Sequence, residues 1–221
     1  MDLVKFWTIS SSNSIVLTEE QIRQFERFES ELRYWNEKVN LISRKDEDNI
    51  FERHFLHSLS ILKYVDLKYK AHCLDFGTGG GFPGIPLKIA RPDLNFLLVD
   101  SIKKKVKITD MFAKHTGLRN IKAISTRVEE LVNERANQQK YDYIFARAVG
   151  KLELIIPWTY KLLKPDGTYI FLKGGDLAEE ISQIKSKFPK INVNIIDIKM
   201  LGADFFESEA KKIVICKFNN N

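Results

Sequence analysis

The 221-residue sequence contains few cysteines and no long hydrophobic run. Its two cysteines, Cys73 and Cys216, lie in apolar, strand-like segments without a pairing pattern, so we expect buried free thiols rather than disulfides. No apolar stretch approaches the roughly 20 residues of a membrane-spanning helix. The first residues lack the basic end and long apolar centre of a signal peptide. These absences predict a cytoplasmic protein without a membrane partner.

Charge is in excess on the basic side, with 35 Lys and Arg against 29 Asp and Glu. The excess is uneven: residues 1–70 carry 11 basic against 12 acidic side chains, whereas residues 71–221 carry 24 against 17. A basic surface of this kind permits a nucleic-acid partner without proving one. The length predicts one sizeable domain with a modest appendage.

Helical patterns occupy the first part of the chain. Residues 18–35 begin with the T-x-x-Q form of a capping box, and their apolar residues recur at spacings of three and four. A second pattern covers residues 50–62, with Asp46 or Asp48 as its expected cap. We therefore predict a helical extension over residues 1–70.

From residue 71 onward, strand patterns alternate with helical patterns. The predicted strands cover 71–76, 95–100, 120–125, 141–149, 168–174, 191–201 and 211–218. The predicted helices begin near Pro86 or cover 103–117, 128–137, 152–164 and 176–188. This alternation predicts a doubly wound, mostly parallel α/β sheet of seven strands over residues 71–221, ending in an edge hairpin. The terminal asparagines, 219–221, are expected to fray.

The segment 74–87, "LDFGTGGGFPGIPL", holds five glycines after a predicted strand. Gly79, Gly81 and Gly84 satisfy the dinucleotide fingerprint G-x-G-x-x-G, and Asp100 follows about 20 residues later, as that fingerprint requires. A nicotinamide-dependent oxidoreductase is therefore one interpretation.

Two absences weaken phosphate-binding interpretations of this loop. Pro83 and Pro86 have no N–H group where a pyrophosphate would need donors. No Lys-Ser/Thr pair follows the last glycine, as a Walker-type loop requires. The register "DFGTGGG", residues 75–81, instead suits S-adenosylmethionine, which carries no phosphate. Gly77 and Gly79 would let the ligand approach the backbone, Asp100 would bind its ribose hydroxyls, and Phe82 would form an apolar wall.

Seven motifs together resemble one family, the bacterial 16S rRNA guanine-N7 methyltransferases, also called glucose-inhibited division protein B. They are "YWNEKVNLIS" (34–43), "ERHFLHSL" (52–59), "DFGTGGGFPGIPL" (75–87), "RPDLNFLLVDS" (91–101), "TRVEEL" (126–131), "FARAV" (145–149) and "FLKGG" (171–175). The resemblance runs from about residue 17 to the last strand. It implies a class I S-adenosylmethionine-dependent methyltransferase with a Rossmann-like fold.

The family's cofactor contacts fall on Gly77, Phe82, Val128, Glu129 and Arg147, with Asp100 expected at the ribose. Its polar positions near the active site and the RNA fall on Asn40, His54, Lys104, Arg127, Arg147 and Lys173, with Arg53 beside His54. The implied substrate is N7 of a guanine in the 530 loop of 16S rRNA, in the small ribosomal subunit or a late precursor. The resemblance also implies rRNA processing in the cytoplasm, and we expect a monomer.

The chain departs from this family at two places. His57 stands where the family usually has an acidic residue, which removes any acidic role there. Lys211 and Lys212 stand where an arginine is expected, which keeps the charge but loses the planar fork of arginine.

Guanine N7 has an in-plane lone pair and no proton, so methyl transfer to it requires no general base. Orientation and preorganised electrostatics can supply most of the catalysis. The segment after the predicted strand 141–149 has neither the Asn/Asp-Pro-Pro-Tyr motif of amine methylation nor the cysteine of pyrimidine C5 methylation. We therefore assign no catalytic residue and no metal site, and keep Arg147, Lys173 and His54 as candidates.

Several roles stay open at this point. Arg147 would bind guanine O6 or a phosphate, or form an ion pair with Asp142 or Glu129. The lysines of 103–107 would contact phosphates or be a solvated helix face. His54 would face RNA or cofactor, or be a half-buried structural histidine.

Three other functions compete with rRNA methylation. A small-molecule or protein methyltransferase would act without ribosomal particles. A sensor would bind the cofactor without turnover. The oxidoreductase would bind a nicotinamide nucleotide.

Overall fold

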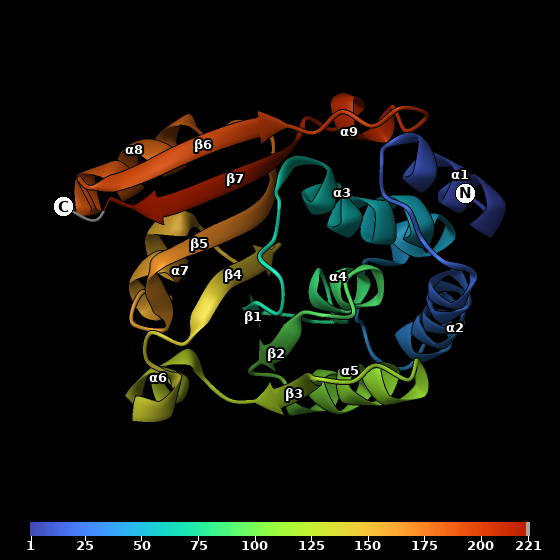
Figure 1. Cartoon of the computed structure of the whole chain (residues 1–221), viewed down its shortest axis with the longest axis horizontal. Coiled ribbons are helices and arrows are strands. Elements are labelled where there is room, and N and C mark those ends of the chain that lie inside the picture. Colours follow the sequence, from blue (N-terminus) through green and yellow to red (C-terminus); the bar gives the residue numbers. More distant parts are fainter. Residues whose placement is uncertain (220–221) are drawn as a thin grey trace.

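A seven-stranded sheet in the order β3-β2-β1-β4-β5-β7-β6 runs through the computed structural model, which describes residues 1–219 (Figure 1). The strands are β1 (His72–Phe76), β2 (Asn95–Asp100), β3 (Ile121–Ser125), β4 (Tyr141–Arg147), β5 (Leu163–Gly174), β6 (Ile191–Asp197) and β7 (Lys211–Phe218). The first five are parallel, and β7 lies antiparallel between β5 and β6. The predicted doubly wound sheet with its edge hairpin is confirmed. The last two asparagines lie outside the described residues.

Helices cover both faces of the sheet, and each face has its own hydrophobic core. On one face lie α1 (Leu3–Ser12), α2 (Glu19–Asn36), η2 (Phe51–Leu56), α3 (His57–Tyr64), α4 (Gly84–Ala90), α5 (Lys103–His115) and α9 (Phe205–Ser208). On the other face lie α6 (Val128–Asn133), α7 (Leu152–Thr159) and α8 (Ala178–Lys187). The remaining elements are two short 3₁₀ helices, η1 (Arg44–Asn49) and η3 (Arg135–Asn137).

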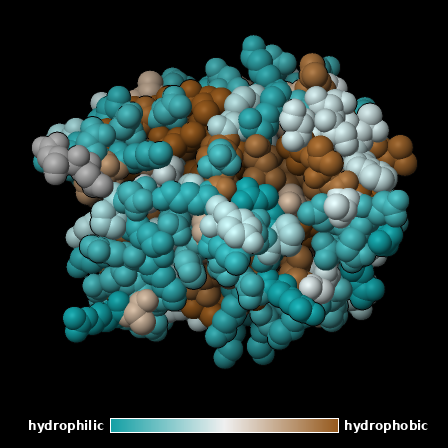
Figure 2. Space-filling model, viewed as in Figure 1, coloured by the Kyte–Doolittle hydropathy of each residue, from teal (hydrophilic) through white to brown (hydrophobic). Residues whose placement is uncertain are grey.

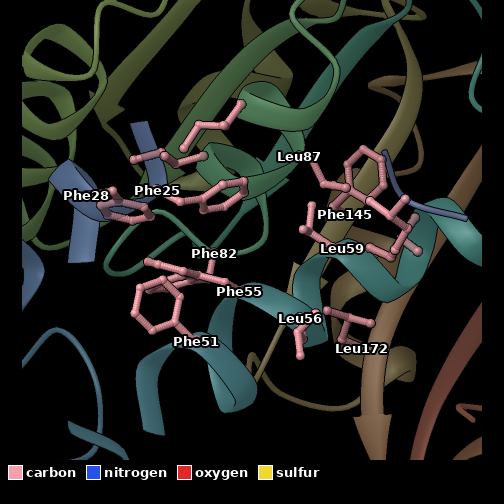
Figure 3. Close-up of a cluster of buried hydrophobic side chains, with 14 of the residues drawn as sticks. Phe25, Phe28, Phe51, Phe55, Leu56, Leu59, Phe82, Leu87, Phe145 and Leu172 are labelled. Carbon is pink, nitrogen blue, oxygen red and sulfur yellow. The ribbon is translucent and has the colours of Figure 1, made fainter. Parts of the chain in front are cut away.

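The predicted helical extension packs directly on the glycine-rich segment. The α2 helix begins with the predicted capping box and buries its apolar stripe. Phe28 on this stripe stacks on Phe82 of the glycine segment, with ring centroids 5.5 Å apart, and on Phe55 of η2 at 5.2 Å (Figure 3). One aromatic cluster thus joins the two parts of the chain, and the division into domains 1–70 and 71–221 stays a prediction.

Several expected boundaries are wrong. The strand predicted over 191–201 ends at Asp197, and the helix predicted over 128–137 ends at Asn133. Residues 44–49 form a 3₁₀ helix, and η2 begins without a side-chain cap, so neither Asp46 nor Asp48 caps it. The helix predicted to reach residue 164 ends at Thr159, because Leu163 already pairs with Tyr141 in the sheet. A four-residue helix, α9, also interrupts the expected direct connection between β6 and β7.

Both cysteines are buried and free, as predicted. Burial raises the pKa of the Cys73 thiol, and it raises that of Cys216 to about 12. Neither thiol is therefore a nucleophile at neutral pH. In the part of the chain that the structure describes, no helix is long and apolar enough to cross a membrane.

The sheet order sets the position of the functional site. The chain moves outward from β1 to β3 in one direction, then returns and continues from β4 in the other direction. Ligands of such sheets bind at the carboxyl ends of the strands where the direction changes. The site is therefore expected above the ends of β1 and β4.

Candidate functional site

The glycine-rich segment makes a tight turn from the end of β1 to the start of α4. Gly77 and Gly79 have positive φ angles of 70° and 55°, which side chains other than glycine's rarely adopt. A Cβ at Gly77 would lie 2.3 Å from Cγ2 of Val149, so glycine is required there by packing within the protein. A Cβ at Gly79 would lie 3.9 Å from the Leu41 carbonyl oxygen, an ordinary van der Waals contact, so its positive φ rather than packing favours glycine at this position.

The N–H groups of this turn bind acceptors inside the protein. Asp75 Oδ2 accepts a hydrogen bond from the Gly84 N–H, at the first residue of α4, at 2.9 Å, and Asp100 Oδ2 accepts one from Gly79 at 3.0 Å. Backbone carbonyls accept the N–H groups of Gly77, Thr78, Gly81 and Phe82. A phosphate would need these donors. The turn is therefore poorly suited to a dinucleotide, because the Asp75 carboxylate already occupies the start of α4.

Asp75 is a fully buried carboxylic acid beneath the turn. Its Oδ2 accepts a hydrogen bond from the Thr78 hydroxyl at 2.7 Å, whereas its Oδ1 is buried without a partner. Burial raises the pKa of this carboxyl to about 7, although the hydrogen bonds and the nearby Arg147 charge favour the ionised form. Asp75 thus titrates near neutral pH and supports the turn from below.

A pocket of 740 Å³, which we call the glycine-turn pocket, lies at the carboxyl ends of β1, β2, β3 and β4. All seven residues predicted to contact a cofactor line it: Gly77, Gly79, Phe82, Asp100, Val128, Glu129 and Arg147. The predicted RNA residue Arg127 also lines it and is exposed at the start of α6. The structure therefore brings together one elongated set of residues from four strand ends.

Asp100 is fixed at the rim of this pocket. Its two carboxylate oxygens accept hydrogen bonds from the N–H groups of Gly79 at 3.0 Å and Ile102 at 2.9 Å. Each carboxylate oxygen has a second lone pair, so the group can still accept from a hydroxyl-bearing ligand. Val99 and Val128 supply buried apolar walls nearby.

Several residues of the glycine-turn pocket were not singled out individually from the sequence, among them Leu41 in the segment after α2 and Trp158 on α7. Leu41 lies within the motif 34–43, but an apolar residue in a loop or on a helix ordinarily predicts core packing. Lys105 on α5 belongs to the lysine run 103–107, for which phosphate contact and a solvated helix face were both left open, and it lines the pocket.

Arg147 ends β4 and lies at the boundary of two pockets. Its guanidinium donates to Nδ1 of His54 and to the backbone carbonyl of Arg53 at 3.3 Å, and its Cζ lies 4.8 Å from the ring centroid of Phe82. The alternative ion pair is not formed: Asp142 pairs with Lys164 at 2.8 Å, and among residues 1–219 no ion pair joins Arg147 to Glu129. Burial lowers the pKa of Arg147 to about 10, so it stays charged at neutral pH.

The second pocket, which we call the basic pocket, measures 300 Å³ and lies beyond Arg147 at the ends of β4 and β5. Its ionisable lining residues are Asp46, Arg53, His54, His57, Arg147, Lys173 and Lys211. Four of the seven predicted substrate or catalytic residues, Arg53, His54, Arg147 and Lys173, therefore meet in one place. Because Arg147 and Ala148 line both pockets, the two pockets adjoin.

The two histidines of the basic pocket are uncharged. Burial, reinforced by the Arg147 charge, lowers the pKa of His54 to about 2 and that of His57 well below its usual value. Since Arg147 donates to Nδ1 of His54, the proton of that ring is assigned to Nε2, which lies 3.6 Å from Asp46 Oδ2. His54 is thus a buried, neutral residue that lies between Arg147 and Asp46, and its Nε2 has no hydrogen-bond partner.

The other predicted RNA residues are placed differently. Asn40 lines a hollow of 560 Å³ with Arg44 and Lys105, next to the glycine-turn pocket. Lys104 is exposed on α5 and lines none of these three pockets. Lys173 lines the basic pocket, but its ammonium donates to Glu180 at 2.7 Å and to the Gly150 carbonyl at 2.7 Å. Lys173 therefore also braces the loop after β4.

No group of three or more His, Cys, Asp or Glu side chains within residues 1–219 is arranged to hold a metal ion. The site therefore consists of a turn, a carboxylate rim and a cationic neighbouring pocket.

The family model for rRNA small subunit methyltransferase G matches residues 21–208. The chain belongs to the rRNA small subunit methyltransferase G family. Similar curated members include those of Christiangramia forsetii, 38% identical over 90% of this chain and 90% of the relative, and Desulforamulus reducens, 36% identical over 91% and 84%. The member from Halalkalibacterium halodurans is 31% identical over 98% of this chain and 91% of its own. The resemblance and the enzyme class, rRNA methyltransferase, are confirmed.

Solved methyltransferase structures have the same fold as this chain. A SAM-dependent methyltransferase from Aquifex aeolicus superposes with a TM-score of 0.57 at 16% identity, covering 78% of this chain and 94% of that chain. A putative methyltransferase solved with the Trm112 activator of Haloferax volcanii gives 0.61 at 11% identity, covering 86% and 98%. The family fold is thus that of class I methyltransferases, with helices preceding the sheet.

Proposed function

We propose that this protein transfers a methyl group from S-adenosylmethionine to N7 of a guanine in the 530 loop of 16S rRNA. The target is presented in the small ribosomal subunit or a late precursor, and the enzyme acts as a cytoplasmic monomer. One observation carries the proposal: the glycine-turn pocket and the basic pocket meet at Arg147. Two adjoining pockets suit methyl transfer, because the methyl donor in one pocket has to contact the methyl acceptor in the other.

The residues present fit S-adenosylmethionine. The turn offers few free N–H donors for a phosphate, whereas the Asp100 carboxylate can accept from ribose hydroxyls. Gly79 lines the pocket without a side chain, and Val99 and Val128 offer apolar walls suited to an adenine ring. Arg147 retains N–H groups for the carboxylate end of the cofactor. When bound, the cofactor supplies a methyl group on a positively charged sulfur.

This chain's contribution to the reaction is orientation and electrostatics. N7 carries no proton, so no group has to remove one, and Arg147 remains a charged donor throughout. His54 and His57 are neutral, so they add no positive charge where the purine becomes cationic. The basic pocket holds the base, and the packing of Phe82 against Phe28 and Arg147 fixes one wall of the glycine-turn pocket.

The deciding test is methyl transfer from labelled S-adenosylmethionine to small subunits that lack the modification, followed by nucleoside analysis. We expect label in 7-methylguanosine at one 16S position, and none with subunits that already carry the methyl group. Label in another nucleoside would contradict the N7 assignment. Binding of the cofactor without transfer to subunits or free 16S rRNA would favour the sensor interpretation.

A further inference from the structure

The basic pocket contains a single carboxylate, that of Asp46. Its other ionisable lining residues are cationic or, as neutral histidines, uncharged. Asp46 lies on η1, and 23% of its side-chain surface is exposed. Asp46 pairs with Arg53 at 3.3 Å, and Arg53 and Lys211 also pair with Glu209 at 2.8 Å and 3.0 Å. A carboxylate repels phosphate but has lone pairs beyond the one that faces Arg53, so Asp46 can also accept from a ligand with hydrogen-bond donors.

Asp46 and Arg147 each lie beside one ring nitrogen of His54. Asp46 Oδ1 lies 3.3 Å from Nη1 of Arg53, and its Oδ2 faces Nε2 of His54, whose other ring nitrogen accepts from Arg147. The backbone of η1 is also tied down, because Glu47 accepts a hydrogen bond from the buried Asn36 side chain at 2.5 Å. A donor group, Arg147, and an acceptor group, Asp46, thus stand on opposite sides of one neutral histidine.

Guanine presents matching groups. Its O6 and N7 are acceptors on one edge, whereas N1–H and the N2 amino group are donors on the neighbouring Watson–Crick edge. With N7 turned toward the glycine-turn pocket at Arg147, the donors turn toward the far side of the basic pocket. Adenine would present an acceptor, its N1, in place of guanine's N1–H.

We propose that Asp46 is a specificity-determining residue, which accepts hydrogen bonds from N1–H and the N2 amino group of the target guanine in the basic pocket. This inference rests on the proposed function and extends it to the recognition of the base. Arg147 donates to the O6 edge of the same base. Adenine would leave the Asp46 carboxylate facing a lone pair, and sites built to pair with a donor strongly reject analogues that lack it.

Asp46 also favours the reaction itself. When N7 bonds to the methyl carbon, the carbon–sulfur bond breaks, its electron pair stays on sulfur, and the purine gains the positive charge. No proton moves in this step, but N1–H and the N2 amino group become stronger donors. A fixed carboxylate that accepts from them stabilises the charge as it develops. Loss of the carboxylate should therefore lower kcat more than it raises KM.

The test compares small subunits reassembled with guanosine or with inosine at the target position. Inosine keeps N7, O6 and N1–H but lacks the N2 amino group. We expect the wild-type enzyme to prefer guanosine by roughly tenfold or more, as for one charged hydrogen bond. In Asp46→Asn the amide N–H would oppose the N2 amino group, so the guanosine rate should fall about 100-fold and the preference should drop to about one or below.

Asp48→Asn is the matched control, because Asp48 lies on the same 3₁₀ helix with 97% of its side chain exposed. It should keep both the rate and the preference. Calorimetric titration with S-adenosylmethionine should give unchanged affinity in both variants, which shows that the protein is folded. Asp46→Glu, which restores the carboxylate, should recover part of the preference.

The outcomes distinguish the role of Asp46 from the proposed function. A wild-type enzyme that methylates guanine N7 together with an Asp46→Asn variant that keeps the full guanosine preference would overturn the role of Asp46 alone. A wild-type enzyme that methylates no guanine N7 would overturn the proposed function and this inference with it.

Discussion

Asp75 both shapes the glycine turn and is a buried titratable group beneath the site. Its carboxyl accepts hydrogen bonds from the Thr78 hydroxyl and from the first N–H of α4, and these bonds shape the glycine turn. The carboxyl is nevertheless fully buried, and its Oδ1 has no hydrogen-bond partner. The sequence identified Asp75 as the first member of the loop register but did not predict that it blocks the start of α4. That role depends on the three-dimensional path of the turn, which residue types alone do not specify.

Asp75 makes stability fall as pH rises toward neutrality. Because burial raises its pKa from 3.8 to about 7, the folded protein keeps this proton after the unfolded chain has lost it. The unfolding free energy contributed by this group is therefore greatest below about pH 4 and declines up to about pH 7. Thermal unfolding without ligand should show Asp75→Asn gaining several degrees relative to wild type between pH 4.5 and 8. Parallel melting curves would contradict this.

Asp100 is expected to bind the cofactor ribose. Asp100→Ala removes about two hydrogen bonds to hydroxyls and the acceptor for the Gly79 N–H, so affinity for S-adenosylmethionine should fall by roughly 2–3 kcal/mol. Isothermal titration calorimetry measures this directly. Exposed Asp48→Ala serves as the control. Unchanged affinity in Asp100→Ala would exclude the placement of the ribose at this carboxylate.

At the scale of elements, most helices and strands follow from periodicity, since the apolar spacings of 22–35 and the buried strands leave few alternatives. The misplaced boundaries, at η1 and at the end of α7, lie where tertiary pairing decides the backbone. The seven positions predicted to contact a cofactor line one pocket, and motifs in the sequence mark them. Leu41 was missed, because only the fold brings the segment after α2 over the glycine turn.

This segment depends on Asn36 at the end of α2. The buried Asn36 Oδ1 accepts hydrogen bonds from the N–H groups of Leu41 at 2.8 Å and Ile42 at 2.9 Å. Asn36→Ala leaves two buried donors unpaired, so the unfolding free energy should fall by about 1–3 kcal/mol. Since Leu41 lines the glycine-turn pocket, cofactor affinity should fall as well. Denaturant unfolding and calorimetry test both effects, and normal values for both would show that the segment is held by other contacts.

At the scale of the whole molecule, charge and hydropathy fit a large anionic partner. The chain carries a net charge of +6, and the face shown in Figure 2 is mainly hydrophilic in its lower half, with hydrophobic residues gathered in its upper half. The sequence predicted the excess of basic charge and named Lys104 as a substrate contact. In the structure Lys105 is the α5 lysine that lines the glycine-turn pocket. The choice between neighbouring lysines requires the orientation of α5, which its charge pattern does not give.

Exposed lysines of α5 should contribute through phosphate contacts. Lys104→Ala should leave cofactor affinity unchanged and weaken subunit binding, and the slope of log K against log salt should become shallower by about one for each lost contact. Filter binding at several salt concentrations measures this slope. Lys5→Ala, on the exposed side of α1, is the control. An unchanged slope would identify the α5 lysines as a solvated face.

The place of β7 in the sheet has a consequence for biosynthesis. Among the described strands β6 pairs only with β7, and β7 in turn separates β6 from β5. During translation β6 and α8 therefore emerge before the strand that attaches them to the sheet exists. The edge of β5 stays open over the same interval, and a nascent chain at this stage exposes an unpaired strand edge that suits contact with a chaperone. The sheet is therefore completed only after the ribosome has translated β7.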